Sequence, residues 1–377
     1  MCGQETPIKL SGRGRPAKRR QAAGSTKGPL GGTLRQSPAY VGLLMSEPLT
    51  ALLDPALSAT VSTRTPLRYD EGASAELDRP GHVRSGSGLA WVPGGLAVVQ
   101  DDANFIAIHD PGSGRTSAIT LPAGEAGLRQ FDDLRGTKRF KLDLESCLAL
   151  EDAGGVNLIA FGSGSTSRRE HVVMVDRWED RAPRVRLVSA PGLYRALRDE
   201  AAFAGSELNI EGAIRLGNSV RLFSRGLGAL PDGRLSVNAT CDLAVDALLG
   251  YLRAPMRVAP PAPTRPVQYR LGTIGAVPLG FTDALAWGDA ILYTATAEIS
   301  PDATQDGPVT GSAIGVIDPG ATVRWAPLTD ARGELLVAKV EGVAAVPGSP
   351  AELYVVLDGD DPTTASELCR VELAGPW

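Results

Sequence analysis

The stretch Lys339-Val340-Glu341-Gly342-Val343-Ala344-Ala345-Val346 is followed, after Pro347-Gly348, by Leu353-Tyr354-Val355-Val356-Leu357-Asp358. Two short apolar runs on either side of a turn predict a pair of antiparallel strands. The first run contains an acidic residue, Glu341, directly before a glycine. This pattern recurs along the chain, and the recurrence determines how the rest of the sequence is interpreted.

Four further copies of the pattern open at Ser87, Glu145, Glu211 and Asp283, so successive openings lie 58 to 72 residues apart. In each copy a second apolar run follows a turn, and further short runs are separated by Gly, Pro, Asp and Asn, which is typical of strands and turns. Third strands are predicted at 105–109, 171–176, 313–318 and 368–373, and fourth strands at 117–121, 185–189, 267–271 and 322–327.

Five similar units of about four strands predict an all-β fold, a single β-propeller of five four-stranded blades, because radial closure removes exposed sheet edges. Six blades is the alternative count, and a two-sheet sandwich is the alternative fold. The propeller is predicted over residues 63–377. Its last unit lacks a fourth strand, and we expect residues 65–69 to supply it and close the ring. Helices are predicted at 193–201 and 242–252.

The composition fits a folded body with unevenly distributed charge. Hydrophobic residues make up 43% and charged residues 21%, close to the globular average. The net charge is −5, yet residues 1–44 carry eight Lys and Arg against one acid, Glu5. Residues 1–62 are therefore predicted to form a flexible basic tail rich in Gly and Pro, able to contact nucleic acid only weakly. A true start at Met45 is the alternative.

Several protein classes are excluded by missing motifs. There is no apolar run long enough to span a bilayer and no secretory leader, so we expect a cytoplasmic protein without membrane contact. We also expect a monomer. Four widely spaced cysteines predict neither a zinc site nor a disulfide framework. Because the Walker and G-x-G-x-x-G patterns are absent, no nucleotide cofactor is expected.

The residues that open the first strands are the candidate site. In a propeller these strands line the central channel, so their openings meet at its mouth. Converging carboxylates repel one another at low effective dielectric, and a hard divalent cation would offset them. Ca²⁺ fits best because it accepts carboxylate oxygens in flexible number. The predicted metal ligands are Glu145, Glu211, Asp283 and Glu341.

A structural role is the alternative for these acids. They would then accept hydrogen bonds from neighbouring blades or pair with Lys141, Lys339 and Arg225. The polar loops between second and third strands share this rim, and a mixed acidic and basic rim suits a small anion bridged to a metal. The predicted ligand-binding residues are Asp101, Asp102, Asn104, Lys141, Arg168, Arg169, Arg225, Glu298, Lys339 and Asp358, and no catalytic residue is assigned.

Four stretches carry a resemblance to known proteins: Ser85-Gly86-Ser87-Gly88-Leu89-Ala90-Trp91, Val99-Gln100-Asp101-Asp102-Ala103-Asn104-Phe105, Leu208-Asn209-Ile210-Glu211-Gly212 and Val340-Glu341-Gly342. Through them, residues from about 65 to 377 resemble an uncharacterised bacterial family of phytase-like or gluconolactonase-like propellers. The resemblance implies that the Glu-Gly pairs at Glu211 and Glu341 supply axial metal ligands. Ser87-Gly88 departs from that pattern.

The function predicted from these observations is that of a metal-assisted hydrolase, acting on phosphoester, lactone or related ester bonds at the channel mouth. The ring of acids beside Lys and Arg side chains is the reason. The alternative is a non-catalytic propeller that binds a small anion, a sugar or a protein partner.

Overall fold

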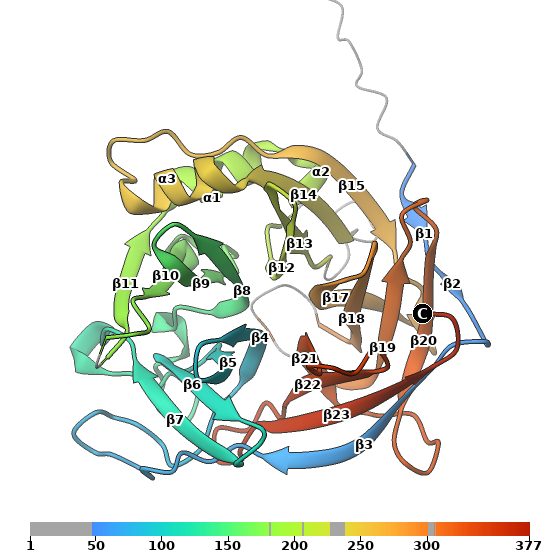
Figure 1. Cartoon of the computed structure of the whole chain (residues 1–377), viewed down its shortest axis with the longest axis horizontal. Helices are drawn as coiled ribbons and strands as arrows, with labels where there is room; N and C mark the ends of the chain where they lie inside the picture. The colour runs from blue at the N-terminus through green and yellow to red at the C-terminus, as the bar shows by residue number, and fades with distance from the viewer. Residues whose placement is uncertain (1–46, 181, 206, 227–237, 301–304, 306) are drawn as a thin grey trace, which may run out of the picture. The chain divides into compact units, whose positions relative to one another are not determined.

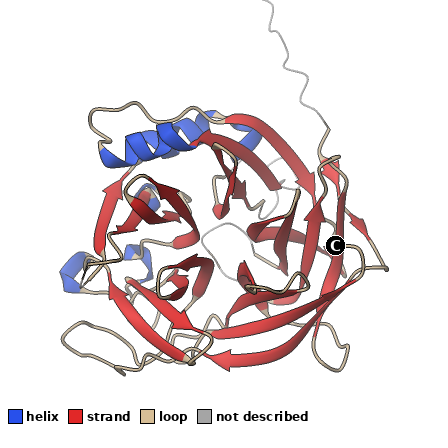
Figure 2. Ribbon diagram, in the orientation of Figure 1, coloured by secondary structure: helices blue, strands red, loops and turns tan. Residues whose placement is uncertain are grey.

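The computed structural model describes residues 47–377 apart from 181, 206, 227–237, 301–304 and 306. Strands dominate, and they are arranged as a ring around a centre (Figures 1 and 2). The prediction of a mostly-β, propeller-like fold is therefore confirmed. Residues 1–46 of the predicted tail lie outside the described residues.

Five inner strands surround the centre of the ring (Figure 1), and each contacts the next until the cycle closes. They are β4 (Gly86–Val92), β8 (Leu144–Asp152), β12 (Ile210–Leu216), β17 (Val277–Trp287) and β21 (Lys339–Ala345). Short connections join each to an antiparallel partner, as predicted. The partners are β5 (Gly95–Gln100), β9 (Gly155–Gly162), β13 (Ser219–Ser224), β18 (Ala290–Glu298) and β22 (Glu352–Asp358).

The outer strands follow in sequence order. They are β6 (Phe105–Asp110), β7 (Arg115–Thr120), β10 (His171–Asp176), β11 (Arg184–Ser189), β14 (Asn238–Ala244), β15 (Thr264–Arg270), β19 (Val309–Ile317), β20 (Val323–Thr329) and β23 (Glu367–Ala374). The predicted third and fourth strands overlap these elements. The described strands form sheets of four, four, five and ten members, because a short parallel contact of β20 with β3 (Ser58–Pro66) joins two antiparallel sets. The count of five blades thus stays a prediction.

The ring is closed by β3, which pairs antiparallel with β23 from Pro66 opposite Glu367 to Ser58 opposite Ala374. The closing strand was predicted at 65–69. The observed strand, β3, both begins and ends earlier in the sequence. Two short strands precede it: β1 (Leu49–Thr50) lies parallel to β15, and β2 (Leu52–Leu53) lies parallel to β20. The predicted boundary at residue 63 falls within β3, whose alternating burial starts at Ala59.

Helices are short and lie beside the ring (Figure 2). The α-helices are α1 (Pro191–Asp199), α2 (Ala201–Ala204) and α3 (Val245–Arg253), and η1 (Glu125–Gly127), η2 (Lys138–Phe140) and η3 (Ser167–Arg169) are single 3-10 turns. The helix predicted at 242–252 begins only at Val245. Asp242 belongs instead to strand β14, where it lies opposite Arg221 of β13. A two-residue strand, β16 (Thr273–Ile274), completes the set. No helix of the described residues is long and apolar enough to cross a membrane.

Glycines next to the strand openings let the inner strands approach closely. A Cβ added at Gly342 would lie 2.9 Å from backbone atoms of Gly88 on β4, and one at Gly88 would lie 3.2 Å from the backbone nitrogen of Cys147 on β8. Backbone atoms cannot turn aside as a flexible side chain can. The glycine of the Glu-Gly pair is thus required by packing between neighbouring inner strands.

We expect Gly342→Ala to lower the free energy of unfolding by about 1–3 kcal/mol, because the added methyl group overpacks the contact of β21 with β4. Urea unfolding of the full chain measures this. Gly320→Ala is the control, since a Cβ at Gly320 meets nothing within 4 Å. Equal stability of the two variants would contradict the close-approach explanation.

Candidate functional site at the channel mouth

Each inner strand carries one extra residue near its start, where the register with its partner shifts. The shifts fall between Gly86 and Gly88, Leu144 and Ser146, Ile210 and Gly212, Phe281 and Asp283, and Val340 and Gly342. A bulge of this kind re-aims a side chain. The equivalent positions around the ring are Ser87, Glu145, Glu211, Thr282 and Glu341.

The alignment of Asp283 with the other acids is therefore wrong by one residue. Thr282 occupies the bulge of β17, and its hydroxyl donates to Oγ1 of Thr294 at 3.0 Å. Asp283 instead stands where the other strands have Gly88, Ser146, Gly212 and Gly342. In sequence, Asp283-Ala284-Leu285 imitates the opening of the other units, and only the strand pairing distinguishes the two alignments.

Asp283 is a structural acid between inner strands. It is 1% exposed, and its Oδ2 accepts the backbone N–H of Val343 on β21 at 2.9 Å while Oδ1 accepts that of Ala284 at 2.8 Å. Burial raises the pKa of Asp283, and the N–H groups of Val343, Ala284 and Leu89 oppose this shift. These contacts match the structural alternative for this residue, in which the acid is bound by neighbouring strands.

One half of the mouth is organised around Lys141. Its Nζ lies 2.6 Å from Oδ1 of Asp101 and 2.6 Å from Oδ1 of Asp143, whose Oδ2 lies 2.8 Å from Nη1 of Arg169. Ser163 also donates its hydroxyl to Asp143. Oxygens of Asp101, Asp143 and Glu145 all lie within 4.8 Å of one another, the spacing at which three acids can share an ion.

The carboxyl groups in this half of the mouth have pKa values shifted in different directions. Burial, together with Asp143 and Asp102, raises the pKa of Asp101 to about 7, against the effect of Lys141. Burial also disfavours ionised Asp143, but Lys141 and Arg169 outweigh it and lower the pKa of Asp143. For Glu145, burial and the charges of Asp101, Asp143 and Glu211 raise the pKa well above its usual range. Glu145 is thus a carboxylate in a strongly negative environment.

The other half is organised around Arg225, which is 4% exposed. Its Nη2 donates to Oε2 of Glu298 at 2.8 Å, and its Nη1 lies 3.8 Å from Oε1 of Glu211. Asn209 donates its side-chain N–H to the same Glu211 oxygen at 2.5 Å. Burial raises the pKa of Glu211 well above its usual value; Arg225 opposes this shift and Glu341 adds to it.

Glu341 is a buried acid of the mouth that lacks hydrogen-bond donors in the described part of the chain. It is 3% exposed, and neither of its oxygens accepts a hydrogen bond from a described residue, although Oε1 lies 3.3 Å from Nζ of Lys339. Burial raises its pKa, against the charges of Lys339 and Arg225. Asp358 is also buried and has a pKa raised by burial well above its usual range. Buried carboxylate oxygens without donors are positions suited to a cation, a water or a proton.

We call these groups the channel-mouth cluster. Carboxylates outnumber cationic side chains in it, so the described residues leave an excess of buried negative charge. The cluster consists of the acids Asp101, Asp143, Glu145, Glu211, Glu298, Glu341 and Asp358 and the cations Lys141, Arg169, Arg225 and Lys339.

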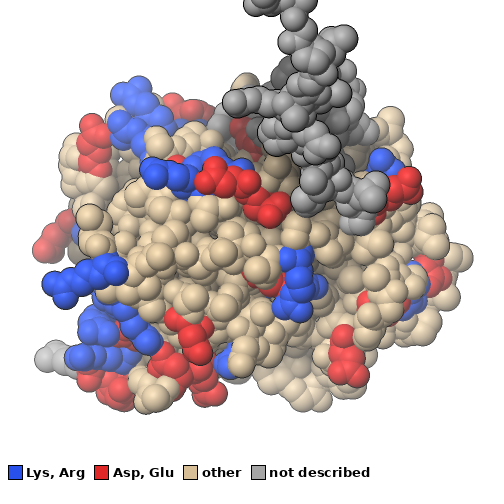
Figure 3. All heavy atoms as spheres, turned by 90° about the horizontal axis from the view of Figure 1, so that it is seen from above, with Lys and Arg blue, Asp and Glu red and all other residues tan. Residues whose placement is uncertain are grey.

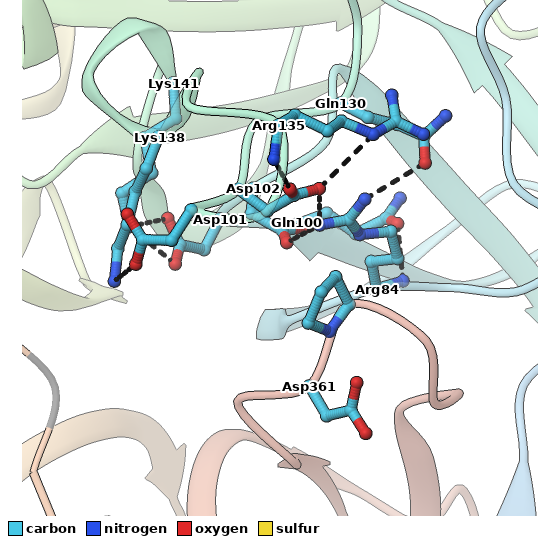
Figure 4. Close-up of polar contacts among 12 residues, drawn as sticks. Arg84, Gln100, Asp101, Asp102, Gln130, Arg135, Lys138, Lys141 and Asp361 are labelled. Atoms are coloured by element: carbon cyan, nitrogen blue, oxygen red, sulfur yellow. Dashed lines mark hydrogen bonds and ion pairs between the residues drawn. The ribbon is translucent and has the colours of Figure 1, made fainter.

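Three predicted ligand residues do not join the cluster. Asp101 and Asp102 are consecutive but turn apart, Asp101 towards Lys141 and Asp102 towards Arg84 (Figure 4). The side chain of Asn104 donates to the carbonyl of Pro122 at 2.9 Å. Arg168 is 62% exposed and stacks 5.2 Å from the ring centre of Phe140. On the side of the molecule in Figure 3, charged side chains of both signs lie in small groups separated by uncharged surface.

Asp143 is the cluster residue that the sequence interpretation missed. It lies within Lys141-Leu142-Asp143-Leu144-Glu145, where charged residues alternate with leucines just before the strand opening. The same alternation occurs in Lys339-Val340-Glu341. This pattern of a cation two to four residues before the bulged acid was the available signal.

The fold and the site define a β-propeller with a buried acid–base cluster at the mouth of its channel. The chain belongs to a family of unknown function, DUF6929, which matches residues 82–373. A comparison with curated protein sequences gave no match.

Solved structures similar to this chain include proteins of several activities. A glutaminyl cyclase of Myxococcus xanthus is 12% identical and covers 88% of this chain and 100% of its own, with a TM-score of 0.40. The calcium-binding protein regucalcin of Agrobacterium tumefaciens is 10% identical over 78% of this chain and 93% of its own, at 0.35. A family 117 glycoside hydrolase of Zobellia galactanivorans is 10% identical over 85% and 92%, at 0.44.

Proposed function

We propose that the channel-mouth cluster binds a divalent cation and that the protein is a metal-assisted hydrolase of phosphoester, lactone or related ester bonds. The observation that carries this proposal is the meeting of Asp101, Asp143 and Glu145 within 4.8 Å in a cluster with excess negative charge. Carboxylate oxygens in this number suit Ca²⁺ better than Mg²⁺, which needs stricter geometry. The resemblance to phytase-like and gluconolactonase-like propellers guides the choice of bonds.

The donor set fits an ion if Lys141 moves. At present its ammonium group stands between Asp101 and Asp143, in the position of a cation. Glu145 forms no ion pair with a described residue within 4.0 Å, so its carboxylate is open to an ion. Asp101, Asp143 and Glu145 would hold the ion, and Arg169 would keep Asp143 in place.

A bound ion of this kind would supply an acidified water and polarise the bond to be cleaved. Lys141, released from the two aspartates, would then contact the anionic part of a substrate. Arg225 and Lys339 already contact Glu211, Glu298 and Glu341, so they would keep these acids in position around the mouth.

We expect Ca²⁺ to raise the melting temperature of the wild-type chain over that in chelator, by the equivalent of about 2.7 kcal/mol at a hundredfold excess over the dissociation constant. Glu145→Gln should lose most of this gain. Its stability in chelator should match or exceed that of wild type, because the raised pKa of Glu145 reflects an ionised form that folding disfavours. Thermal melts with Ca²⁺, Mg²⁺, Mn²⁺ and chelator measure these differences.

Glu151→Gln is the matched control, since Glu151 lies on the same strand and is exposed. It should keep the full response to Ca²⁺. Wild-type melting that ignores both chelator and every added ion would refute the metal site. Hydrolysis is tested separately on phosphoester and lactone panels with and without Ca²⁺, and inactivity on all of them would refute the enzyme while leaving the ion site standing.

A non-catalytic propeller that binds a small anion, a sugar or a protein partner is the second candidate. It is favoured by the cations of the mouth, since Lys141, Arg169 and Arg225 are already paired with acids. We further propose that the propeller has five blades, which the closed cycle of inner strands supports. We also propose that the protein is monomeric and cytoplasmic and that its partner is a small anion.

A further inference from the structure

A pocket of about 530 Å³ opens beside the channel mouth and uses none of the cluster residues. Three segments from different connections enclose it: residues 73–84 between β3 and β4, residues 130–135, and Pro362–Thr363 after β22. Its volume lies within the range of small-molecule sites. The pocket is therefore large enough for a molecule of the size of a sugar derivative.

Arginines determine the chemistry of the lining. Arg84 is 2% exposed, and its Nη1 donates to Oε1 of Gln130 at 3.0 Å while its Nη2 contacts Asp102 and lies 3.1 Å from Asp132 (Figure 4). Arg79 has an 8% exposed side chain stacked 5.4 Å from the ring centre of Tyr69. Both side chains are thus held in place before any ligand binds.

Each of these two arginines has a buried Nε–H without a hydrogen-bond partner among the described residues. A buried donor without an acceptor is costly, and such groups in native proteins usually bind a water or an ion. Among the described residues Arg186, Arg225 and Arg370 also have such an Nε–H, but of these five arginines only Arg79 and Arg84 line this pocket, where a ligand with acceptor oxygens would satisfy them. Arginine is also the side chain best suited to carboxylate and phosphate groups.

The charge of the lining has the sign that such a ligand needs. Arg79, Arg84 and Arg135 face two lining acids, Asp78 and Asp132, which Arg135 contacts at 3.1 and 3.4 Å. The Arg135 side chain is 40% exposed, so it remains accessible from the opening. Among the lining residues the arginines therefore exceed the acids by one charge with neutral histidine, while Asp102 and Glu71, which do not line the pocket, also contact Arg84 and Arg79.

His82 and several small apolar residues complete the lining. Nε2 of His82 lies 3.3 Å from the carbonyl oxygen of Pro362, which can only accept, so the other ring nitrogen is an acceptor when the ring is neutral. Ala73, Ala75 and Pro80 offer apolar surface. A ligand with hydroxyl groups on a compact carbon body would match both features.

We infer that this pocket binds a small organic anion, a carboxylate or phosphate carried on a hydroxylated body, through Arg79, Arg84 and Arg135. The inference is independent of the proposed function, because it involves neither a metal ion nor any residue of the channel-mouth cluster. It adds a second ligand site on the rim of the propeller.

Calorimetric titration of the full chain in chelator tests this site with three probes on one sugar body: glucuronate, glucose 6-phosphate and uncharged glucose. At least one anion should bind, and glucose should bind about tenfold more weakly or less. Arg135→Gln and Arg79→Lys should each weaken the anion about tenfold, the first by removing a charge and the second by removing the Nε donor.

Arg370→Gln is the matched control. Its side chain is also 40% exposed and pairs with an acid, Glu352, at 2.7 Å, but it does not line the pocket. It should leave anion affinity unchanged. The inference is overturned if neither anion binds, if glucose binds as well as the anions, or if Arg135→Gln binds like Arg370→Gln. Since Arg135 is exposed, that variant tests the site even if Arg79→Lys does not fold.

Discussion

Asp283→Ala should lower the free energy of unfolding by about 3–5 kcal/mol, among the largest effects of any single substitution in this chain. Both oxygens of Asp283 accept backbone N–H groups, one of them from Val343 on the adjacent inner strand. Alanine removes both acceptors at a site that is 1% exposed, so the donors are left buried without partners. Urea unfolding followed by circular dichroism measures the difference.

Asp283→Asn should fall between wild type and the alanine variant, because one acceptor oxygen remains and the amide N–H₂ faces a donor. Asp289→Ala is the control, since Asp289 lies exposed in the turn of the same hairpin. A loss below about 0.5 kcal/mol for Asp283→Ala, the scale of ordinary surface changes, would show that the carboxylate does not join the inner strands. The residue would then return to the list of candidate metal ligands.

Arg225→Met should also destabilise the fold strongly, by about 3–5 kcal/mol near neutral pH. The substitution keeps an apolar stem but removes the charge that balances Glu298 at 2.8 Å and Glu211 at 3.8 Å. Breaking a buried ion pair from one side leaves the other charge uncompensated. Chemical unfolding at several pH values measures the cost.

The loss of unfolding free energy in Arg225→Met should grow as pH rises. Arg225 opposes the rise of the pKa of Glu211, so its removal raises that pKa further above the unfolded value. A carboxyl with a raised folded pKa loses stability as pH rises. The deficit of Arg225→Met against wild type should therefore be smaller at pH 5 than at pH 8.

Two further variants serve as controls. Arg225→Lys should recover part of the loss, and Arg215→Met should leave stability unchanged because Arg215 is exposed. A deficit independent of pH would argue against an electrostatic origin.

Much of the fold was predictable because local sequence patterns specify its turns and strands. Turns such as Gly217-Asn218 and Gly288-Asp289 fix hairpins by short-range geometry, and apolar runs between them fix strands. The closing strand was harder. Residues 65–69 were predicted to form it, yet β3 spans Ser58–Pro66. The alternation of polar and apolar residues in β3 indicates a strand only once its pairing with β23 is known.

The site was predictable only in part, since side chains from distant loops complete it. Glu145, Glu211 and Glu341 were found at equivalent bulges because the repeat itself places them. Asp283 was misaligned because residue type outweighed strand register, and a shift of one residue turns a side chain to the other face of a strand. Arg84 and Asp132, which build the neighbouring pocket, come from long connections whose paths no periodic pattern specifies.

The pairing of β3 with β23 also has a consequence for the order in which the protein folds. Arg64 and Glu367, partners across this pair, are separated by 303 residues in the chain. Loop-closure entropy opposes such a contact until the strands between them have formed, and contacts this distant in sequence slow folding. During synthesis β3 is made about 300 residues before its partner β23. The edge of β3 should therefore remain unpaired until β23 has been made, and ring closure should be a late, rate-limiting event.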